Sequence, residues 1–416
     1  MSDSGYSIEL GVSRRKLMKQ LSAVGAAAGA AGIAGCQSLQ GGSGGSDGGD
    51  GTATGTEGNS GGGGGQGGGS GIPSYNFVPM QAPPAWDQVD LTAPENPPRT
   101  MDWVLHVSAI EFFNRTMIGA NDALHQLGWD GTFMGPSETD VQQHVEMLND
   151  RVASLEPGDA IATSVLDPDA YVDPINNALD NDIAVIQVNT DVRNSWDREF
   201  MLNEFGTILP YVGQNPYTAG NAVADLAYQR AQEELDADEF EAILGIETPG
   251  HPHLQLRLDG YQNALEHHGV NVIEPVTTTN DISTATTRIT DRYNANPDTN
   301  IMMGTHTPAT TGAANLVESE GLRDEMIVGG FDIPETTVQN IQAGNVDLTV
   351  GQDPYSQGYV AAHLMFAYLD RGIPMKDYET GITLIDQSTV DFNQSRDGAT
   401  TELLEWQGQN YENTVQ

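Results

Sequence analysis

The chain has 416 residues, of which 38% are hydrophobic, and it carries 58 acidic against 17 basic side chains, a formal charge of -41 at pH 7. This excess of carboxylates excludes nucleic acid as a partner, because phosphate backbones are bound through cationic side chains. It is typical of a protein from a hypersaline habitat, since such self-repulsion destabilises a compact chain in dilute buffer.

The first 35 residues have the features of an export signal. Arg14–Arg15 precede a stretch of small and apolar residues at 21–35, which is too short to span a bilayer but suits the hydrophobic region of a signal peptide. Paired arginines ahead of such a stretch resemble a twin-arginine signal. The stretch ends in Ile33–Cys36, which resembles a lipobox, so we expect Cys36 to be lipidated. Stable anchoring takes two acyl chains, which would hold the mature protein on the outer face of the cell membrane.

A long tether follows the predicted signal. Residues 37–71 are rich in Gly, Ser, Thr and acidic residues, and several prolines follow up to Pro98. A segment of this composition cannot bury a core. We therefore predict that residues 36–98 are a disordered linker that holds a globular head away from the membrane. Since Cys36 is the only cysteine, the head has no intrachain disulfide and depends on burial alone.

From Met101 onwards, short apolar runs alternate with helical patterns of apolar residues, as in parallel sheets that are covered by helices on both faces. The first series has predicted strands at 103–107, 160–163 and 183–188, an apolar run at 208–212, and helices around 117–127, 141–152 and 216–235. The second series has predicted strands at 242–246, 270–276, 301–304, 326–330 and 348–350, and helices at 254–268, 283–296, 308–320 and 334–343.

Two such series predict an α/β protein with two doubly wound parallel-sheet lobes. We assign residues 99–213 plus 353–376 to the N-terminal lobe, residues 214–352 plus 377–392 to the C-terminal lobe, and residues 393–416 to a C-terminal tail. The chain then crosses between the lobes three times, near Gly213–Asn215, Gln352–Pro354 and Gly372–Lys376.

Motifs for catalysis are missing from the sequence. It contains no G-x-S-x-G elbow, no Walker A loop and no H-E-x-x-H pair. His251 and His253 lack the further ligands of a metal site, so we interpret them as solvated surface histidines. The acidic cluster at 167–173 lacks the glycine and glutamate of a calcium-binding loop. We therefore expect a protein that is not an enzyme and that uses no cofactor and no metal.

Polar and aromatic side chains gather just after the predicted strands, where open parallel sheets bind their ligands. Aromatic faces cover the C–H groups of a sugar, while Arg, Asp, Asn and Gln each satisfy several hydroxyls. This combination predicts a site for a small polyhydroxylated ligand. The candidate ligand-binding residues are Ser108, Phe112, Phe113, Ser164, Asn189, Arg257, Thr305, Asp332 and Gln352.

Five segments of this region resemble the ribose/galactose-type periplasmic binding proteins of sugar ABC transporters, which have the type I fold. In their order and spacing from about Met101 to Phe392, they are Val107–Phe113, Ala184–Asn189, Arg257–Tyr261, Val328–Asp332 and Val350–Pro354. The resemblance implies a three-segment hinge that closes the lobes over a monosaccharide. It also implies that the closed monomer docks on ABC permease subunits.

The resemblance also assigns roles to single residues. Phe112 and Phe113 match the aromatics that stack on the ligand, and the matches to the family's polar contacts are Arg257, Asp332 and Gln352. The sequence departs from the ribose binders at Ser164, Asn189 and Thr305, where those proteins have Asn, Asp and Asn, and its segment after Ser108 is shorter. The ligand therefore stays open between a pentose and a hexose. The alternatives are a sensory receptor, or a binding protein for a polyol, a nucleoside or an autoinducer-like molecule.

Overall fold

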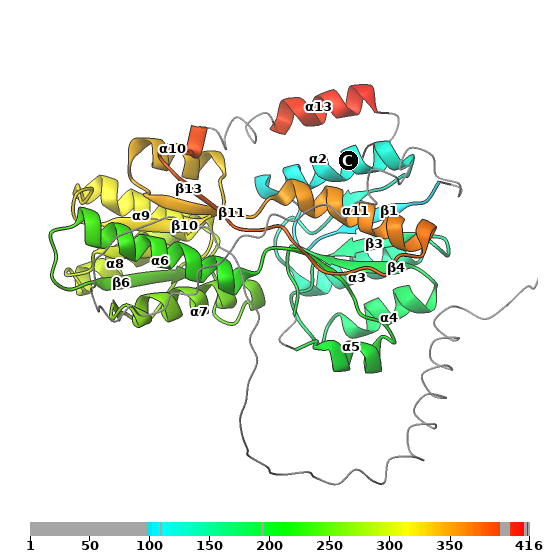
Figure 1. The fold of residues 1–416 in the computed structure, drawn as a ribbon, viewed down its shortest axis with the longest axis horizontal. Coiled ribbons are helices and arrows are strands. Elements are labelled where there is room, and N and C mark those ends of the chain that lie inside the picture. Colours follow the sequence, from blue (N-terminus) through cyan, green and yellow to red (C-terminus); the bar gives the residue numbers. More distant parts are fainter. Residues whose placement is uncertain (1–97, 109, 193–194, 392–399, 412–413, 415–416) are drawn as a thin grey trace, which may run out of the picture. The chain divides into compact units, whose positions relative to one another are not determined.

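The computed structural model describes residues 98–108, 110–192, 195–391, 400–411 and 414 (Figure 1). The predicted signal peptide, Cys36 and all but the last residue of the predicted linker lie outside these ranges. Within the described ranges, no helix combines the length and the apolar character that a membrane crossing requires.

The N-terminal lobe is built on a six-stranded, all-parallel sheet with the strand order β12-β5-β4-β3-β1-β2. Its strands are β1 (Met101–Val104), β2 (Phe133–Met134), β3 (Ala160–Thr163), β4 (Ala184–Val188), β5 (Tyr211–Gly213) and β12 (Tyr378–Glu379). Its helices are α2 (Glu111–Leu127), α3 (Val141–Val152), α4 (Val172–Asp180), α5 (Arg198–Glu204), α11 (Pro354–Arg371) and α13 (Thr400–Asn410).

Both faces of this sheet are buried, which explains why its strands are mostly apolar. Trp103 faces a core that contains residues of α2 and α11, whereas its neighbour Val104 faces a core made with α3, α4 and α5. In the same way, Ala162 faces the core with α2 and α11, and Ile161 faces the core with α3, α4 and α5. Successive side chains of a strand point to opposite faces, so each strand contributes to two hydrophobic layers.

The C-terminal lobe repeats the plan on a seven-stranded sheet with the order β13-β11-β10-β9-β6-β7, while β8 pairs with the end of β6. Its strands are β6 (Glu241–Ile246), β7 (Asn271–Val272), β8 (Val276–Thr277), β9 (Ile301–Gly304), β10 (Ile327–Phe331), β11 (Leu348–Gly351) and β13 (Thr383–Asp386). Its helices are α6 (Pro216–Glu234), α7 (Pro252–His267), α8 (Ile282–Ala295), α9 (Thr307–Glu320) and α10 (Glu335–Ala343). One face packs on α6 and α7, and the other on α8, α9 and α10.

The predicted lobe boundary at residue 377 is corrected by the pairing of β12. Tyr378 and Glu379 pair with β5 in the N-terminal sheet, and Asp377 Oδ1 accepts the Tyr211 N–H at 2.9 Å. The third crossing therefore lies at Thr380–Ile382, after β12, rather than at Gly372–Lys376. A two-residue edge strand carries too little periodicity to be found in a sequence. The other two crossings, at Gln214–Asn215 and Gln352–Asp353, lie where we expected them.

Gln214 joins all three crossings. Its side chain is fully buried, and its Nε2 donates to the carbonyl oxygens of Gly351 at 3.1 Å and Gly381 at 3.0 Å. The backbone carbonyl of Gln214 accepts from the Tyr211 hydroxyl at 3.1 Å. One amide side chain thus connects the first crossing to Gly351, which directly precedes the second crossing, and to Gly381, which lies within the third.

Two glycines let α6 and α7 approach at backbone distance. A Cβ atom on Gly220 would lie 2.4 Å from the carbonyl oxygen of Arg257, and one on Gly260 would lie 2.4 Å from that of Tyr217. Either side chain would overlap backbone that cannot move aside. The position of Arg257 along the cleft is therefore fixed by contact with α6.

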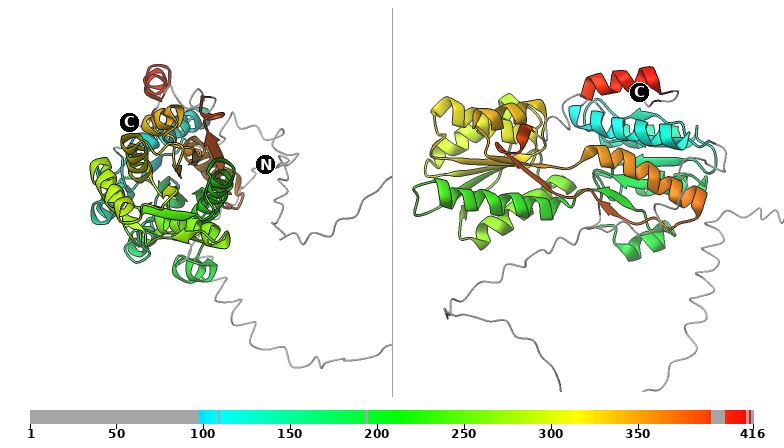
Figure 2. Two further views of the ribbon diagram at one scale, coloured as in Figure 1. Left: turned by 90° about the vertical axis from the view of Figure 1, so that its left-hand side faces the viewer. Right: turned by 45° about the horizontal axis from the view of Figure 1, so that its top comes forward.

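The predicted C-terminal tail forms the helix α13, which lies beside α2 on the N-terminal lobe (Figures 1 and 2). Gln407 is fully buried there; its Nε2 donates to Ile118 O at 3.0 Å and Asp122 Oδ1 at 2.9 Å, and its Oε1 accepts from Asn121 at 3.1 Å. The tail is therefore part of the folded lobe from Thr400 to at least Tyr411, whose hydroxyl also donates to Asp122.

Candidate ligand-binding site

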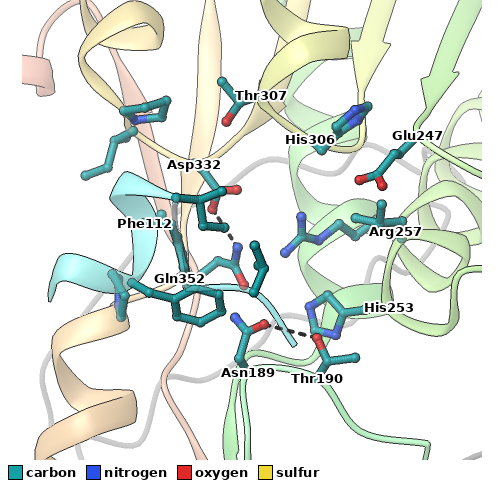
Figure 3. A pocket seen from close by; sticks show the side chains of 18 of the residues that line it. Phe112, Asn189, Thr190, Glu247, His253, Arg257, His306, Thr307, Asp332 and Gln352 are labelled. Carbon is teal, nitrogen blue, oxygen red and sulfur yellow. Dashed lines mark hydrogen bonds between the residues drawn. The ribbon is translucent and has the colours of Figure 1, made fainter. Parts of the chain in front are cut away.

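A cavity of about 410 Å³ lies where the carboxyl ends of the strands of the two lobes meet (Figure 3). Its lining comes from both lobes and from the second crossing, and its size is in the range of small-molecule sites. Six of the nine predicted site residues line it: Phe112, Phe113, Asn189, Arg257, Asp332 and Gln352. The cavity is therefore the candidate site.

Arg257, Asp332 and Gln352 form the polar centre of the cavity. The Arg257 side chain is 3% exposed; its Nη1 donates to Thr305 O at 2.8 Å, and its guanidinium lies 3.9 Å from the centroid of the Phe331 ring. Gln352 Nε2 donates to Asp332 Oδ1 at 2.5 Å. Arg257 Nε and Gln352 Oε1 are buried and have no protein partner, so each retains unused hydrogen-bonding capacity.

Burial governs the charge of these groups. It raises the pKa of the Asp332 carboxyl, against the opposing effects of Arg257 and Gln352. It also lowers the pKa of the Arg257 guanidinium, which Asp332 in turn raises. Each group thus favours the charged form of the other, and together they present a polar pair with little net charge.

Strained backbone also gathers at the cavity. Five described non-glycine residues have positive φ, and three of them line it: Asn189 at 65°, Asp332 at 68° and Asp353 at 50°. Asn and Asp tolerate this left-handed conformation best, but it still costs energy. Such strain concentrates at functional sites, where it directs side chains toward a ligand.

The aromatic and amide groups of the N-terminal lobe face the polar centre. Phe112 is partly exposed and lies beside the cavity in Figure 3, while Phe113 is 1% exposed and belongs to the lobe core. The two rings meet edge to face, with centroids 5.1 Å apart. Asn189 Nδ2 donates to Gln357 at 3.2 Å, and its Oδ1 accepts from Thr190 at 3.0 Å. Phe112 is therefore the better candidate for stacking on a ligand.

Ser108, Ser164 and Thr305 do not line the cavity but support residues near it. Ser108 Oγ donates to Gly135 O at 2.9 Å. Ser164 Oγ lies 2.8 Å from both the backbone nitrogen and Nδ1 of His106, which does line the cavity. Thr305 gives only its carbonyl oxygen, to Arg257. β1 ends at Val104, three residues earlier than the predicted strand. The residues on either side of Ser108, Val107 and Ile110, line the cavity, whereas Ser108 itself turns to Gly135.

Sequence reasoning missed a group of histidines at the cavity: His106, His251, His253 and His306. The interpretation of His251 and His253 as solvated surface residues is wrong, because His253 is 3% exposed and His251 is partly buried. Burial lowers the pKa of His251 and of His306 to about 4, and lowers that of His253 well below its ordinary value. The signal available in the sequence was spacing, since His253 lies one helical turn before Arg257.

The model of the periplasmic binding protein domain matches residues 102–373, which include most of both lobes. The chain belongs to the periplasmic binding protein family. The family and the α/β fold with two doubly wound lobes, both predicted from the sequence, are thereby confirmed.

This periplasmic binding protein is similar to curated and solved relatives. It is 29% identical over 305 residues to the xylose/arabinose-binding protein XylF of Sulfolobus acidocaldarius, covering 71% of this chain and 73% of that protein. The glucose-galactose binding protein GanP of Geobacillus stearothermophilus has a TM-score of 0.61 at 23% identity, over 70% of this chain and 99% of GanP. A solute-binding protein of Agrobacterium vitis, solved with α-D-tagatopyranose, has a TM-score of 0.63 at 24% identity, over 70% and 96%. These relatives are named as binding proteins and not as enzymes.

Proposed function

We propose that this protein captures a small neutral sugar outside the cytoplasm and delivers it, chemically unchanged, to an ABC importer. The observation that carries the proposal is the convergence of Arg257, Asp332, Gln352, Asn189 and the ring of Phe112 on one cavity. These groups come from both lobes, and they combine an aromatic face with several donors and acceptors, as a polyhydroxylated ligand requires.

The charges around the cavity favour a neutral ligand. Three carboxyl groups line it, those of Glu247, Asp332 and Asp353, against the two guanidinium groups of Arg115 and Arg257. Arg257 already interacts with Asp332 and with a backbone carbonyl. A carboxylate or phosphate would therefore meet unfavourable charge, whereas a hydroxyl can donate to the carboxyl groups and accept from Arg257.

A pentose is the first candidate, and a hexose the second. The curated relative is named for xylose and arabinose, and a solute-binding protein of Burkholderia graminis with a TM-score of 0.61 at 20% identity was solved with D-arabinose. The glucose-galactose and tagatose relatives support a hexose on the same fold.

Capture would proceed by closure at the three crossings. A ligand that bonds Asn189 of the N-terminal lobe and Arg257 of the C-terminal lobe favours the arrangement in which both reach it. Closure removes the ligand from water, so a sugar that leaves one buried polar group unpaired loses about 1–3 kcal/mol. In this way the site would reject the wrong epimer.

The proposal is tested by calorimetric titration in concentrated salt with D-xylose, L-arabinose, D-arabinose, D-tagatose, D-glucose and D-galactose. We expect at least one to bind, and Arg257→Ala and Asp332→Ala to weaken that binding at least tenfold. Arg288→Ala is the matched control, because Arg288 is exposed on α8 of the same lobe. Binding of inositol or a nucleoside alone, or of no compound at all, would refute the proposal.

We also propose that Cys36 carries the lipid that holds the protein at the membrane, and that residues 36–98 tether the head. Cys36 directly follows the predicted signal peptide and precedes the glycine-rich segment. The test compares cell fractions for the wild type and Cys36→Ser: the wild type should sediment with membranes, and the variant should not be retained there by a lipid. Equal membrane retention of the two proteins would contradict anchoring through Cys36.

A further inference from the structure

A nine-residue motif occurs twice in the chain, at the first and at the second crossing between the lobes. Residues 212–220 read VGQNPYTAG and residues 350–358 read VGQDPYSQG, so the two copies differ at only three positions. In each copy a strand ends at the first glycine and a helix begins at the proline: β5 and α6 in the first copy, β11 and α11 in the second (Figure 1). The last glycine lets each helix approach a neighbour at backbone distance, since a Cβ atom on Gly358 would lie 2.0 Å from Thr116 O of α2. The two crossings can therefore be compared residue by residue.

The copies differ in backbone conformation at the residue before the proline. Asn215 has φ -76° and ψ 107°, the extended conformation that is usual for the residue that caps a helix. Asp353 has φ 50° and ψ 64°, which is left-handed. Both residues cap their helix in the same way: Asn215 Oδ1 accepts from Thr218 N at 3.1 Å, and Asp353 Oδ1 accepts from Ser356 N at 3.3 Å. Capping therefore does not require the left-handed conformation.

The conformation of Asp353 costs free energy. In a left-handed residue the Cβ atom lies too close to the following carbonyl oxygen. A residue that precedes a proline also favours the extended region, and Asp353 precedes Pro354. The residue type does not explain the choice, because Asp140 and Asp281 cap α3 and α8 with an extended backbone. Strain of this kind persists only where the surrounding structure holds it.

Contacts with both lobes hold Asp353 in place. On one side, Gln352 Nε2 donates to Asp332 Oδ1 of the C-terminal lobe at 2.5 Å (Figure 3). On the other side, Ser356 Oγ, on α11 of the N-terminal lobe, donates to Asp353 Oδ2 at 2.6 Å. Thr380 Oγ1 of the third crossing donates to Gln352 O at 2.7 Å. The cavity beside these groups is lined by both lobes, so the strained conformation belongs to the arrangement in which the lobes enclose it.

We propose that Asp353 is a positioning residue that opposes closure of the lobes. Its backbone is left-handed while the lobes enclose the cavity, and it takes up the extended conformation of Asn215 when they separate. Lobe movement needs residues at the ends of elements that absorb a change in φ and ψ, and Asp353 lies between β11 and α11 in the second crossing. The contacts of a bound ligand must offset this strain, so the strain lowers the affinity and keeps the ligand-free protein open. The effect on affinity rests on the proposed function.

The first test compares Asp353→Gly with Asp353→Ala. Both variants lose the carboxylate that caps α11 and lines the cavity, so they differ only in how well the backbone accepts the left-handed conformation. Glycine accepts it freely, and alanine does not. The tightest-binding sugar of the panel above should therefore bind Asp353→Gly about 3- to 10-fold more tightly than Asp353→Ala.

The matched control is the same pair of substitutions at the other copy of the motif. Asn215 is extended, so glycine relieves no strain there. Asn215→Gly and Asn215→Ala should bind the sugar with equal affinity. A gap between them as large as the gap at Asp353 would refute the inference, because glycine would then act through general flexibility of a crossing.

A second measurement needs no ligand. In solution scattering, ligand-free Asp353→Gly should have a smaller radius of gyration than ligand-free Asp353→Ala, because more of its molecules have closed lobes. The two Asn215 variants should have equal radii. If the strain were present in the open and the closed arrangement alike, Asp353→Gly would have a higher Tm than Asp353→Ala, but the two would agree in affinity and in radius of gyration.

The outcomes separate this inference from the proposed function. If the wild type binds a sugar of the panel but Asp353→Gly and Asp353→Ala bind it equally well, the inference is refuted while the proposed function stands. A difference between these two variants in Tm alone also refutes the inference. If the wild type binds no sugar of the panel, the proposed function fails, and the radii of gyration alone decide whether Asp353 opposes closure.

Discussion

Gln214 offers the most direct test of how the crossings are held together. Its Nε2 donates to Gly351 O and Gly381 O, and the side chain is fully buried. Gln214→Leu removes both hydrogen bonds with little change in volume. Each bond contributes about 1 kcal/mol, so the free energy of unfolding should fall by about 2 kcal/mol. For a folded region of this size, the Tm should fall by roughly 4 °C.

The control for Gln214→Leu is Gln187→Leu in the N-terminal lobe. Gln187 is also buried, at 3% exposed, but its side chain makes a single long bond of 3.5 Å to Leu209 O and touches no crossing. Urea unfolding and thermal melting of both variants give the comparison. The lobes of Gln214→Leu should also adopt a wider range of relative orientations, visible as a larger radius of gyration in solution scattering. A Gln214→Leu protein that is as stable as Gln187→Leu would refute this account.

Three further predictions concern stability. Burial lowers the pKa of His144 and His306 to about 4. As the pH falls, these histidines therefore bind protons in the unfolded chain before they do so in the folded protein, which favours unfolding. Each histidine should lower the free energy of unfolding by about 2 kcal/mol between neutral pH and pH 5. Equal urea midpoints at pH 7.5 and 5 would contradict this. Arg151 lies 2.6 Å from the buried Asp102 carboxylate, and Arg151→Met leaves this carboxylate without its partner. The free energy of unfolding in urea should fall by about 3–5 kcal/mol, and adding Asp102→Leu to the variant should restore most of it. Gln407→Ala breaks the contact of α13 with α2 and should speed proteolysis of the C-terminus; an unchanged rate would argue against it.

The two-lobed fold was predictable because strands buried on both faces are mostly apolar, and the intervening helices keep their periodicity. The elements that escaped prediction are short or lie at edges, such as β12 and α5. The segment 270–276 was predicted as one strand but forms β7 and β8, which are separated at Glu274–Pro275 because proline cannot donate a ladder hydrogen bond.

The site was predictable where a residue directly follows a strand, as Asn189 and Asp332 do. The prediction of site residues failed where the exact end of a strand decides which side chain faces the cavity, as at Ser108. It failed again at His253, because a buried histidine and an exposed one look alike in a helical sequence. The spacing of His253 to Arg257 was the only sequence signal for it, and the packing of α6 against α7 fixes the position of Arg257 along the cleft.

The contact of α6 with α7 links the two parts of the proposed mechanism. α6 begins at the first crossing, and Gly220 sets it against the backbone of Arg257, so any turning of the C-terminal lobe carries α7 along without internal adjustment. In the proposed mechanism, the C-terminal half of the site is thus assembled before a ligand binds and moves as one rigid unit. Selectivity and movement are then encoded in different residues, so the preferred ligand can be changed on the inner face of α7 while the motion of the lobes stays the same.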